Sequence, residues 1–79
     1  MAAERKLHRW TRRNEINWKI WHLNANFNLD LKPDYRCGGV RIMDAGTLRD
    51  LSPRGTKRDI IVWLEGFREA MLENERRKA

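Results

Sequence analysis

The clearest hydrophobic pattern lies in the last third of the chain, over residues 56–77. Apolar side chains recur there three and four positions apart, which is the spacing of one face of an α-helix. They are Ile60, Leu64, Phe67 and Met71, with Trp63 beside them. Thr56 is followed three residues later by Asp59, the spacing of a capping box at a helix start. The pattern predicts a long C-terminal helix that supplies one side of the core.

Residues 16–32 show a different pattern, because they are rich in β-formers and alternate between apolar and polar side chains. From Trp21 to Leu31 every second residue is apolar, and asparagine or aspartate fills most of the positions between. A single strand over residues 16–31 would be about 50 Å long at about 3.3 Å per residue, too long for so small a domain. We therefore interpret this region as a hairpin, with strands over residues 16–23 and 27–32.

A continuous helix is the alternative interpretation of the same region. Extending a first helix to Leu23 would place Leu7, Trp10, Trp18 and Trp21 on one side. Ile16, Ile20 and Leu23 would then share the opposite face, and no segment obviously covers them. For this reason we favour the hairpin.

The following segments are shorter. Pro33 is expected to end the preceding strand, because proline cannot donate to a ladder. Residues 40–43 predict a third strand, and residues 47–51 have the Thr-x-x-Asp start of one helical turn. Ser52 to Gly55 then lead into the main helix.

These segments predict an α+β fold in a single small domain. A basic N-terminal helix or arm covers residues 1–14, a small antiparallel three-stranded sheet lies within 16–43, and the main helix of 56–77 packs across one sheet face. The expected core brings two sets of side chains together: Trp63, Leu64, Phe67 and Met71 with Trp21, Phe27, Leu29 and Ile42.

The charge balance of the sequence indicates what kind of partner the protein binds. The chain has 79 residues, with 17 lysines and arginines against 11 acids and a formal net charge of +6. Such an excess favours polyanionic partners, including nucleic acid. The lone Cys37 excludes an internal disulfide. Without an apolar run of about 18 residues or a signal peptide, we expect a cytoplasmic protein that does not enter a membrane.

Two basic clusters are candidates for phosphate contacts. The first contains Arg5, Lys6, Arg9, Arg12 and Arg13 around Trp10, and the second contains Arg54, Lys57 and Arg58 at the entry to the main helix. Guanidinium groups pair with phosphates, and an indole can stack on an unpaired base. We predict a nucleic-acid-binding regulator, with RNA slightly favoured over DNA. The alternative is that Trp10 packs on the core and the arginines are only solvated.

No set of residues in the sequence resembles a catalytic or metal site. His8, His22 and Cys37 fit neither the spacing of a zinc site nor a nucleophile with its base. Gly38-Gly39 lacks the pattern of a phosphate-binding loop. We therefore expect no enzyme activity, no cofactor, no metal and no small-molecule substrate.

A second contact surface is predicted on the main helix. Ile61, Val62 and Leu72 lie outside its apolar stripe, and a helix that is apolar on more than one side suggests a partner. A homodimer through this helix is one hypothesis. The other is an inhibitor or adaptor that binds a protein of a nucleic-acid-handling complex, since aromatic residues and arginine are enriched at interface hot spots.

The run Trp63-Leu64-Glu65-Gly66-Phe67-Arg68-Glu69-Ala70-Met71 resembles the C-terminal stretch of ribosome modulation factor. That family consists of small basic bacterial proteins that silence ribosomes by binding ribosomal RNA. The rest of the chain departs from the family, because it is longer and lacks the family's N-terminal Tyr and Gly spacing and its Cys-Pro-Tyr element. The resemblance implies a bacterial or phage-encoded binder and carries over no functional residue.

Overall fold

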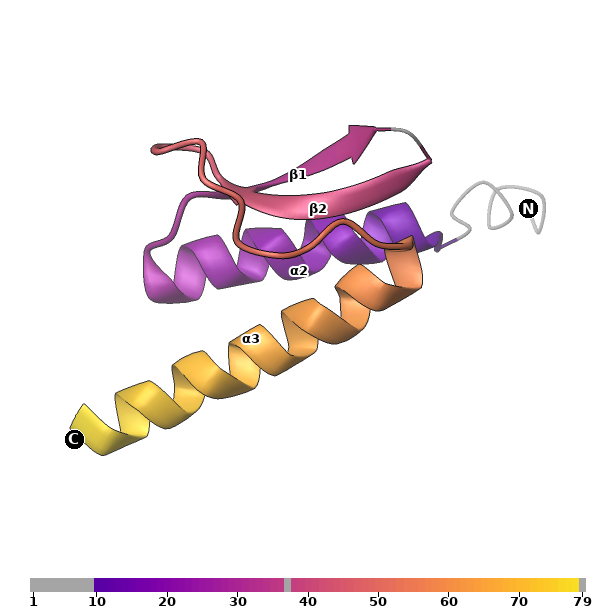
Figure 1. The fold of residues 1–79 in the computed structure, drawn as a ribbon. Helices are drawn as coiled ribbons and strands as arrows, with labels where there is room; N and C mark the ends of the chain where they lie inside the picture. Colours follow the sequence, from indigo (N-terminus) through magenta and orange to yellow (C-terminus); the bar gives the residue numbers. More distant parts are fainter. Residues whose placement is uncertain (1–9, 37, 79) are drawn as a thin grey trace, which may run out of the picture.

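A computed structural model describes residues 10–36 and 38–78. Its elements are α2 (Arg12–Phe27), β1 (Leu31–Arg36), β2 (Gly39–Asp44) and α3 (Lys57–Lys78). The two helices lie on the same side of the β1–β2 hairpin and run in the same direction, so both begin at one end of the molecule (Figure 1). α2 packs on β1, and α3 packs on both β2 and α2. The fold is α+β, as the sequence predicts.

Residues 12–27 form one α-helix, so the predicted strands over 16–23 and 27–32 are wrong. The helix begins after Thr11, whose Oγ1 accepts a hydrogen bond from the Asn14 amide at 3.1 Å. It ends at Asn28, which has the left-handed φ of 55° that asparagine tolerates at a helix C-terminus. The predicted N-terminal helix is corrected as well: Arg12–Asn14 are the first turn of α2, while residues 1–9 lie outside the described part of the chain.

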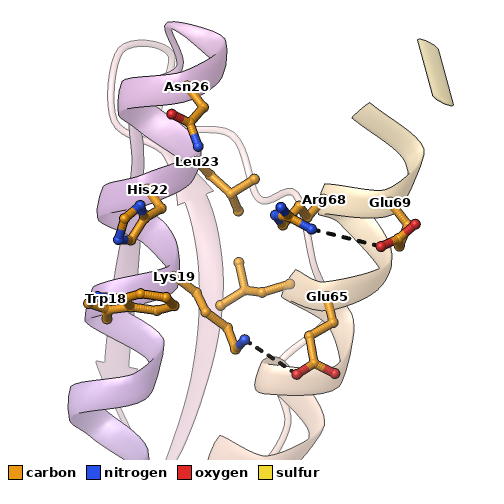
Figure 2. Close-up of a pocket in the computed structure, with 9 residues that line it drawn as sticks. Trp18, Lys19, His22, Leu23, Asn26, Glu65, Arg68 and Glu69 are labelled. Atoms are coloured by element: carbon orange, nitrogen blue, oxygen red, sulfur yellow. Dashed lines mark ion pairs between the residues drawn. The ribbon is translucent and has the colours of Figure 1, made fainter. Parts of the chain in front are cut away.

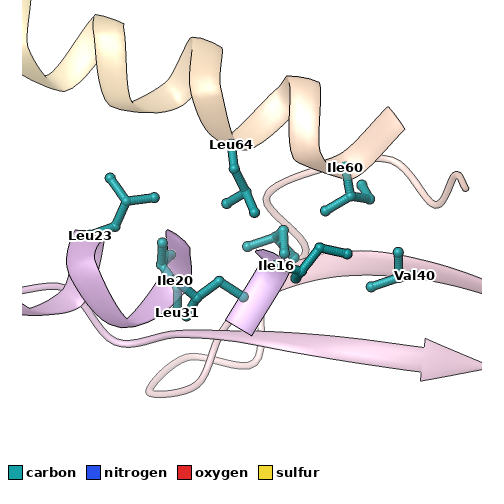
Figure 3. Packing of buried hydrophobic residues seen from close by; sticks show 8 residues of the cluster. Ile16, Ile20, Leu23, Leu31, Val40, Ile60 and Leu64 are labelled. Atoms are coloured by element: carbon teal, nitrogen blue, oxygen red, sulfur yellow. The ribbon is translucent and has the colours of Figure 1, made fainter. Parts of the chain in front are cut away.

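The buried face of α2 is the one for which the sequence offered no cover. Ile16, Ile20 and Leu23 are buried in one cluster with side chains of the sheet and of α3 (Figure 3). The buried members of this core are Ile16, Ile20, Leu23, Leu31, Val40, Ile42, Ile60 and Leu64. Each such side chain contributes about 1.5–3 kcal/mol of transfer free energy. The expected burial of Trp21 is wrong, because 65% of this residue is exposed.

The sheet has two antiparallel strands rather than the predicted three. β2 confirms the strand expected at 40–43, and β1 pairs with it from Leu31↔Asp44 to Arg36↔Gly39. The other edge of β2 is covered by the segment 50–55, whose Gly55 exchanges two backbone hydrogen bonds with Val40, both at 2.9 Å. This segment occupies the place of a third strand through isolated bridges. The helical turn expected at 47–51 is therefore wrong.

Pro33 lies inside β1 and does not end it, contrary to prediction. Its partner is Ile42, whose amide donates to Ser52 Oγ at 2.9 Å and whose carbonyl accepts from Leu51 at 2.8 Å. Since the backbone groups of Ile42 point away from β1, the pair is a non-hydrogen-bonded one. The missing N–H of Pro33 therefore costs the ladder no hydrogen bond.

An asparagine attaches α2 to the outer edge of β1. The Asn24 side chain donates to the Leu31 carbonyl at 3.1 Å and accepts from the Leu31 amide at 2.8 Å. Both backbone groups of Leu31 that face away from β2 are thereby satisfied. The contact fixes the position of the helix relative to the strand.

The capping box at the start of α3 is confirmed. The Thr56 amide donates to Asp59 Oδ2 at 3.2 Å, and the Asp59 amide donates to Thr56 Oγ1 at 3.1 Å. The helix then runs over Lys57–Lys78, one residue from the predicted end. Among the described residues, no helix has both the length and the apolar character needed to cross a membrane.

Candidate nucleic-acid interface

The first turns of α2 and α3 lie beside the β1–β2 turn at one end of the molecule (Figure 1). An open depression at this end is lined by Arg12, Gly38, Thr56, Lys57 and Arg58. We use the name cationic end for Arg12 and Arg13 of α2 with Lys57 and Arg58 of α3, all of which are exposed. The structure thus brings together members of both predicted basic clusters.

The cations of this end have few internal partners. Within the described part of the chain, Arg12, Lys57 and Arg58 form no ion pair. Positive charge in the first turn of a helix is also unfavourable against the helix dipole. Asp59 and Glu15 supply negative charge nearby, but Asp59 is used in the helix cap and Glu15 contacts Trp10 and Lys19. The cationic end therefore carries a surplus of positive charge available to an external anion.

Arg13 is held by an aromatic ring. Its guanidinium carbon lies 4.3 Å from the centroid of the Tyr35 ring. The Tyr35 hydroxyl donates to Asn17 Oδ1 at 3.2 Å, which ties β1 to α2. Burial raises the pKa of Tyr35 above its ordinary value, although the charge of Arg13 acts in the opposite direction. Tyr35 is thus a neutral support that orients Arg13 at the cationic end.

Arg54 has a different role from the other predicted phosphate contacts. Its Nη2 lies 2.8 Å from Asp34 Oδ2, and its Nη1 donates to the Arg36 carbonyl at 2.9 Å. The Asp34 carboxylate also pairs with Arg36 Nε at 2.9 Å and with Arg41 Nε at 3.1 Å. Arg54 therefore joins segment 50–55 to β1 and is largely engaged within the protein.

The same cluster sets the protonation of Asp34. Burial would raise the pKa of this carboxyl, but the charges of Arg36 and Arg54 and the hydrogen bonds from Arg41 and Arg54 outweigh it and hold the pKa below its ordinary value. Asp34 is consequently ionised over the physiological pH range. Its charge offsets part of the positive charge of the surrounding arginines.

Trp10 is 58% exposed, so the alternative that it packs on the core is wrong. Its Nε1 donates to Glu15 Oε1 at 3.3 Å. Three further predicted contact residues, Arg5, Lys6 and Arg9, lie outside the described residues. The basic residues at the other end of α3 differ from the cationic end, because Arg76 and Arg77 pair with Glu73 at 2.9 and 3.6 Å.

The three residues predicted as a partner surface do not form one patch. Ile61 is partly buried and packs against the core, Leu72 is half-buried, and only Val62 is largely exposed, at 62%. At about 100° per residue, Val62 lies roughly 80–100° around the helix from the other two. The homodimer hypothesis stays a prediction.

The largest exposed apolar side chains of the described helices lie instead on α2. Trp18 is 51% exposed and Trp21 is 65% exposed. Both lie on the face opposite Ile16, Ile20 and Leu23. The sequence does contain a signal for this face, because Trp10, Trp18 and Trp21 fall on one side of a helix. The hairpin interpretation does not use that signal.

A groove of about 550 Å³ separates α2 from α3 (Figure 2). We call it the helix groove; it is lined by Trp18, Lys19, His22, Leu23, Asn26, Leu64, Glu65, Arg68 and Glu69. Leu23 and Leu64 are buried at its base. Lys19 Nζ crosses it to Glu65 Oε2 at 3.3 Å and also contacts Glu15 Oε2 at 3.4 Å. The groove is apolar at its base and charged along its rim.

Among residues 10–36 and 38–78, no group of three or more histidine, cysteine, aspartate or glutamate side chains could hold a metal ion. No family model matches the chain, and no curated protein or solved structure gives a match. The resemblance of residues 63–71 to ribosome modulation factor is therefore a local one.

Proposed function

We propose that this protein is a small, non-enzymatic nucleic-acid-binding regulator that contacts phosphates through its cationic end. The observation that carries the proposal is the meeting of Arg12 with Lys57 and Arg58, which come from two helices and have no ion-pair partner in the described part of the chain. Phosphate oxygens would pair with these cationic groups. They would also be favoured by the partial positive charge at the start of each helix.

RNA is the slightly favoured ligand. Arginine side chains beside exposed indoles suit single-stranded loops and bulges, where unpaired bases are accessible. Trp10 and Arg12 give this combination at the start of α2, since the indole is exposed and precedes the helix by two residues. DNA with unpaired bases offers the same chemistry, so the binding experiment should include both.

The test is the dependence of binding on salt concentration. Fluorescence anisotropy with a labelled RNA oligonucleotide gives the logarithm of the association constant against the logarithm of salt concentration. Each phosphate contact contributes about 0.7–0.9 to the slope, so the variant R12A/K57A/R58A should lower its magnitude by about 2–3. The matched control is R76A/R77A/K78A, which removes the same number of charges from the far end of α3.

The two variants separate a local site from a net-charge effect. The proposal requires that the cationic-end variant lose more slope and affinity than the control. An equal loss in both variants would mean that only net charge matters. Absence of binding by the unmodified protein at about 50 mM salt, where phosphate contacts are strong, would reject the proposal.

A second candidate function is an inhibitor or adaptor that binds another protein. It is favoured by the exposure of Trp18 and Trp21, since tryptophan is enriched at interface hot spots. Copurification separates the two candidates. A protein partner retained after nuclease treatment and about 0.5 M salt supports the adaptor, whereas nucleic acid released by salt supports the regulator.

A further inference from the structure

The exposed indoles of α2 are part of a continuous aromatic surface. The Trp18 and His22 rings have centroids 4.2 Å apart, at 60° to each other. Trp21 also contacts His22, with its ring centroid 5.0 Å from that of His22 in an edge-to-face arrangement. His22 thus lies in contact with both indoles. Trp18 and His22 line the helix groove (Figure 2), and Trp21 extends their aromatic surface away from it.

The indoles of this surface have exposed ring faces and N–H groups that are available to a ligand. Trp18 and Trp21 are more than half exposed. Within residues 10–36 and 38–78, neither indole N–H has a hydrogen-bond acceptor. Large aromatic side chains usually bury their area in a core or an interface. Two of them beside each other on one helix indicate a ligand with flat apolar faces.

The charges around the aromatic surface indicate which ligand fits. In the helix groove, Lys19 and Arg68 balance Glu65 and Glu69, so its formal charge is zero. The cationic end of the same helix is positive, and Trp18 follows Arg12 by six residues, which is about 9 Å along the axis and about 120° around it. The phosphates of one strand of duplex DNA repeat at about 3.4 Å along its axis, so a strand of a few nucleotides is long enough to reach from Trp18 to the cationic end.

We propose that α2 binds single-stranded nucleic acid, with unpaired bases stacked on Trp18 and Trp21 and the phosphates of neighbouring nucleotides at the cationic end. This inference rests on the proposed function and adds the class of nucleic acid. A neutral base matches the neutral groove wall, and the charged backbone matches the positive helix start. Duplexes do not fit this arrangement, because their base faces are already stacked inside the helix.

The groove supplies polar groups for the edge of a bound base. Asn26 lies on its rim with an amide that can both donate and accept. Arg68 lies opposite on α3, and its nearest carboxylate, that of Glu69, is 3.8 Å away. The stacking surface and Asn26 belong to α2, whereas Arg68 belongs to α3. A base bound at Trp18 would therefore contact both α2 and α3.

The test compares single-stranded and duplex oligonucleotides of about ten residues with the variant W18A/W21A. Anisotropy should show tighter binding of the single strand than of the duplex by the unmodified protein. In the variant, the association constant for the single strand should fall by about tenfold for each indole removed, because base stacking is lost. The association constant for the duplex should not change. The salt slope should stay unchanged, because no phosphate contact is removed.

The control is L48A, which truncates an exposed apolar residue of the loop that follows β2. It should leave both affinities unchanged, and circular dichroism should show that α2 remains helical in W18A/W21A. If the unmodified protein binds single strand and duplex equally, or the variant keeps its single-strand affinity, the inference is wrong while the proposed function stands. If no nucleic acid binds at low salt, both fail.

One further outcome assigns the surface elsewhere. A protein partner that resists nuclease and is lost from W18A/W21A, with oligonucleotide binding unchanged, would overturn the inference. The indoles would then belong to a protein interface.

Discussion

Arg54 Nη2 and Asp34 Oδ2 lie 2.8 Å apart on the outer face of the sheet, and this contact joins segment 50–55 to β1. The same carboxylate accepts from Arg41 Nε at 3.1 Å. Asp34 is therefore a centre around which two strands and one loop segment are assembled. Its ionised form is the one that the folded protein prefers.

The first prediction concerns pH. Because the pKa of Asp34 is held below its ordinary value of 3.8, the folded state binds this proton less readily than the unfolded state. Its contribution to stability is therefore present above that value and is lost as the pH falls through the lower pKa of the folded state. D34N should reduce the midpoint of thermal unfolding at pH 7 and flatten the loss of stability in acid.

The control for this prediction is D50N. Asp50 contacts Arg41 Nη1 at 2.9 Å, but its side chain is half exposed. An exposed pair contributes little, so D50N should keep the acid profile of the unmodified protein. An unchanged acid profile in D34N would contradict the assigned role of Asp34.

The second prediction tests the direction in which α2 faces. Ile20 is 5% exposed and Trp21 is 65% exposed, although they are neighbours in sequence. I20A should lower the free energy of unfolding by about 2–5 kcal/mol, and I20V by about 0.5–1.5 kcal/mol if the alanine variant does not fold. W21A should change it by no more than about 0.5 kcal/mol. Urea unfolding measures the free energy of unfolding of I20A, I20V and W21A. A large decrease in W21A would mean that Trp21 is buried, as the hairpin interpretation expected.

The third prediction separates two arginines that the sequence grouped together. R58A should lower the magnitude of the oligonucleotide salt slope by about 0.7–0.9 and leave thermal stability unchanged. R54A removes the contacts with Asp34 and the Arg36 carbonyl. It should lower the midpoint of unfolding by about 4–8 °C, the shift that about 1 kcal/mol produces in a domain of this size. Equal effects of the two variants on stability would show that the distinction is wrong.

The parts of the fold that the sequence predicted correctly are those decided by local pattern. The stripe of Ile60, Leu64 and Phe67 with the cap at Thr56 specifies α3 without reference to distant residues. For α2, the stripe of Ile16, Ile20 and Leu23 needed a cover that α3 and the sheet supply from far along the chain. The alternating asparagines favoured a strand pattern. One of them, Asn24, is instead a helical residue whose side chain forms two hydrogen bonds with the backbone of Leu31 in β1.

The candidate site shows the same division. Arg12, Lys57 and Arg58 could be chosen from the sequence by charge, but their meeting depends on the two helices starting at one end. Arg54 could not be separated from them, since its partner Asp34 is 20 residues away. Trp18 and Trp21 were placed in a strand and a core, and only the burial of the opposite helical face assigns them to the surface.

The backbone contacts of β1 also bear on self-association. Exposed strand edges recruit strands from other chains, the usual first step toward aggregated sheets. Here Asn24 occupies the outward groups of Leu31, Pro33 offers no donor to an incoming strand, and the opposite border of the hairpin is taken by Gly55 and its neighbours. Both edges of the hairpin therefore offer few free backbone groups to a strand of another chain.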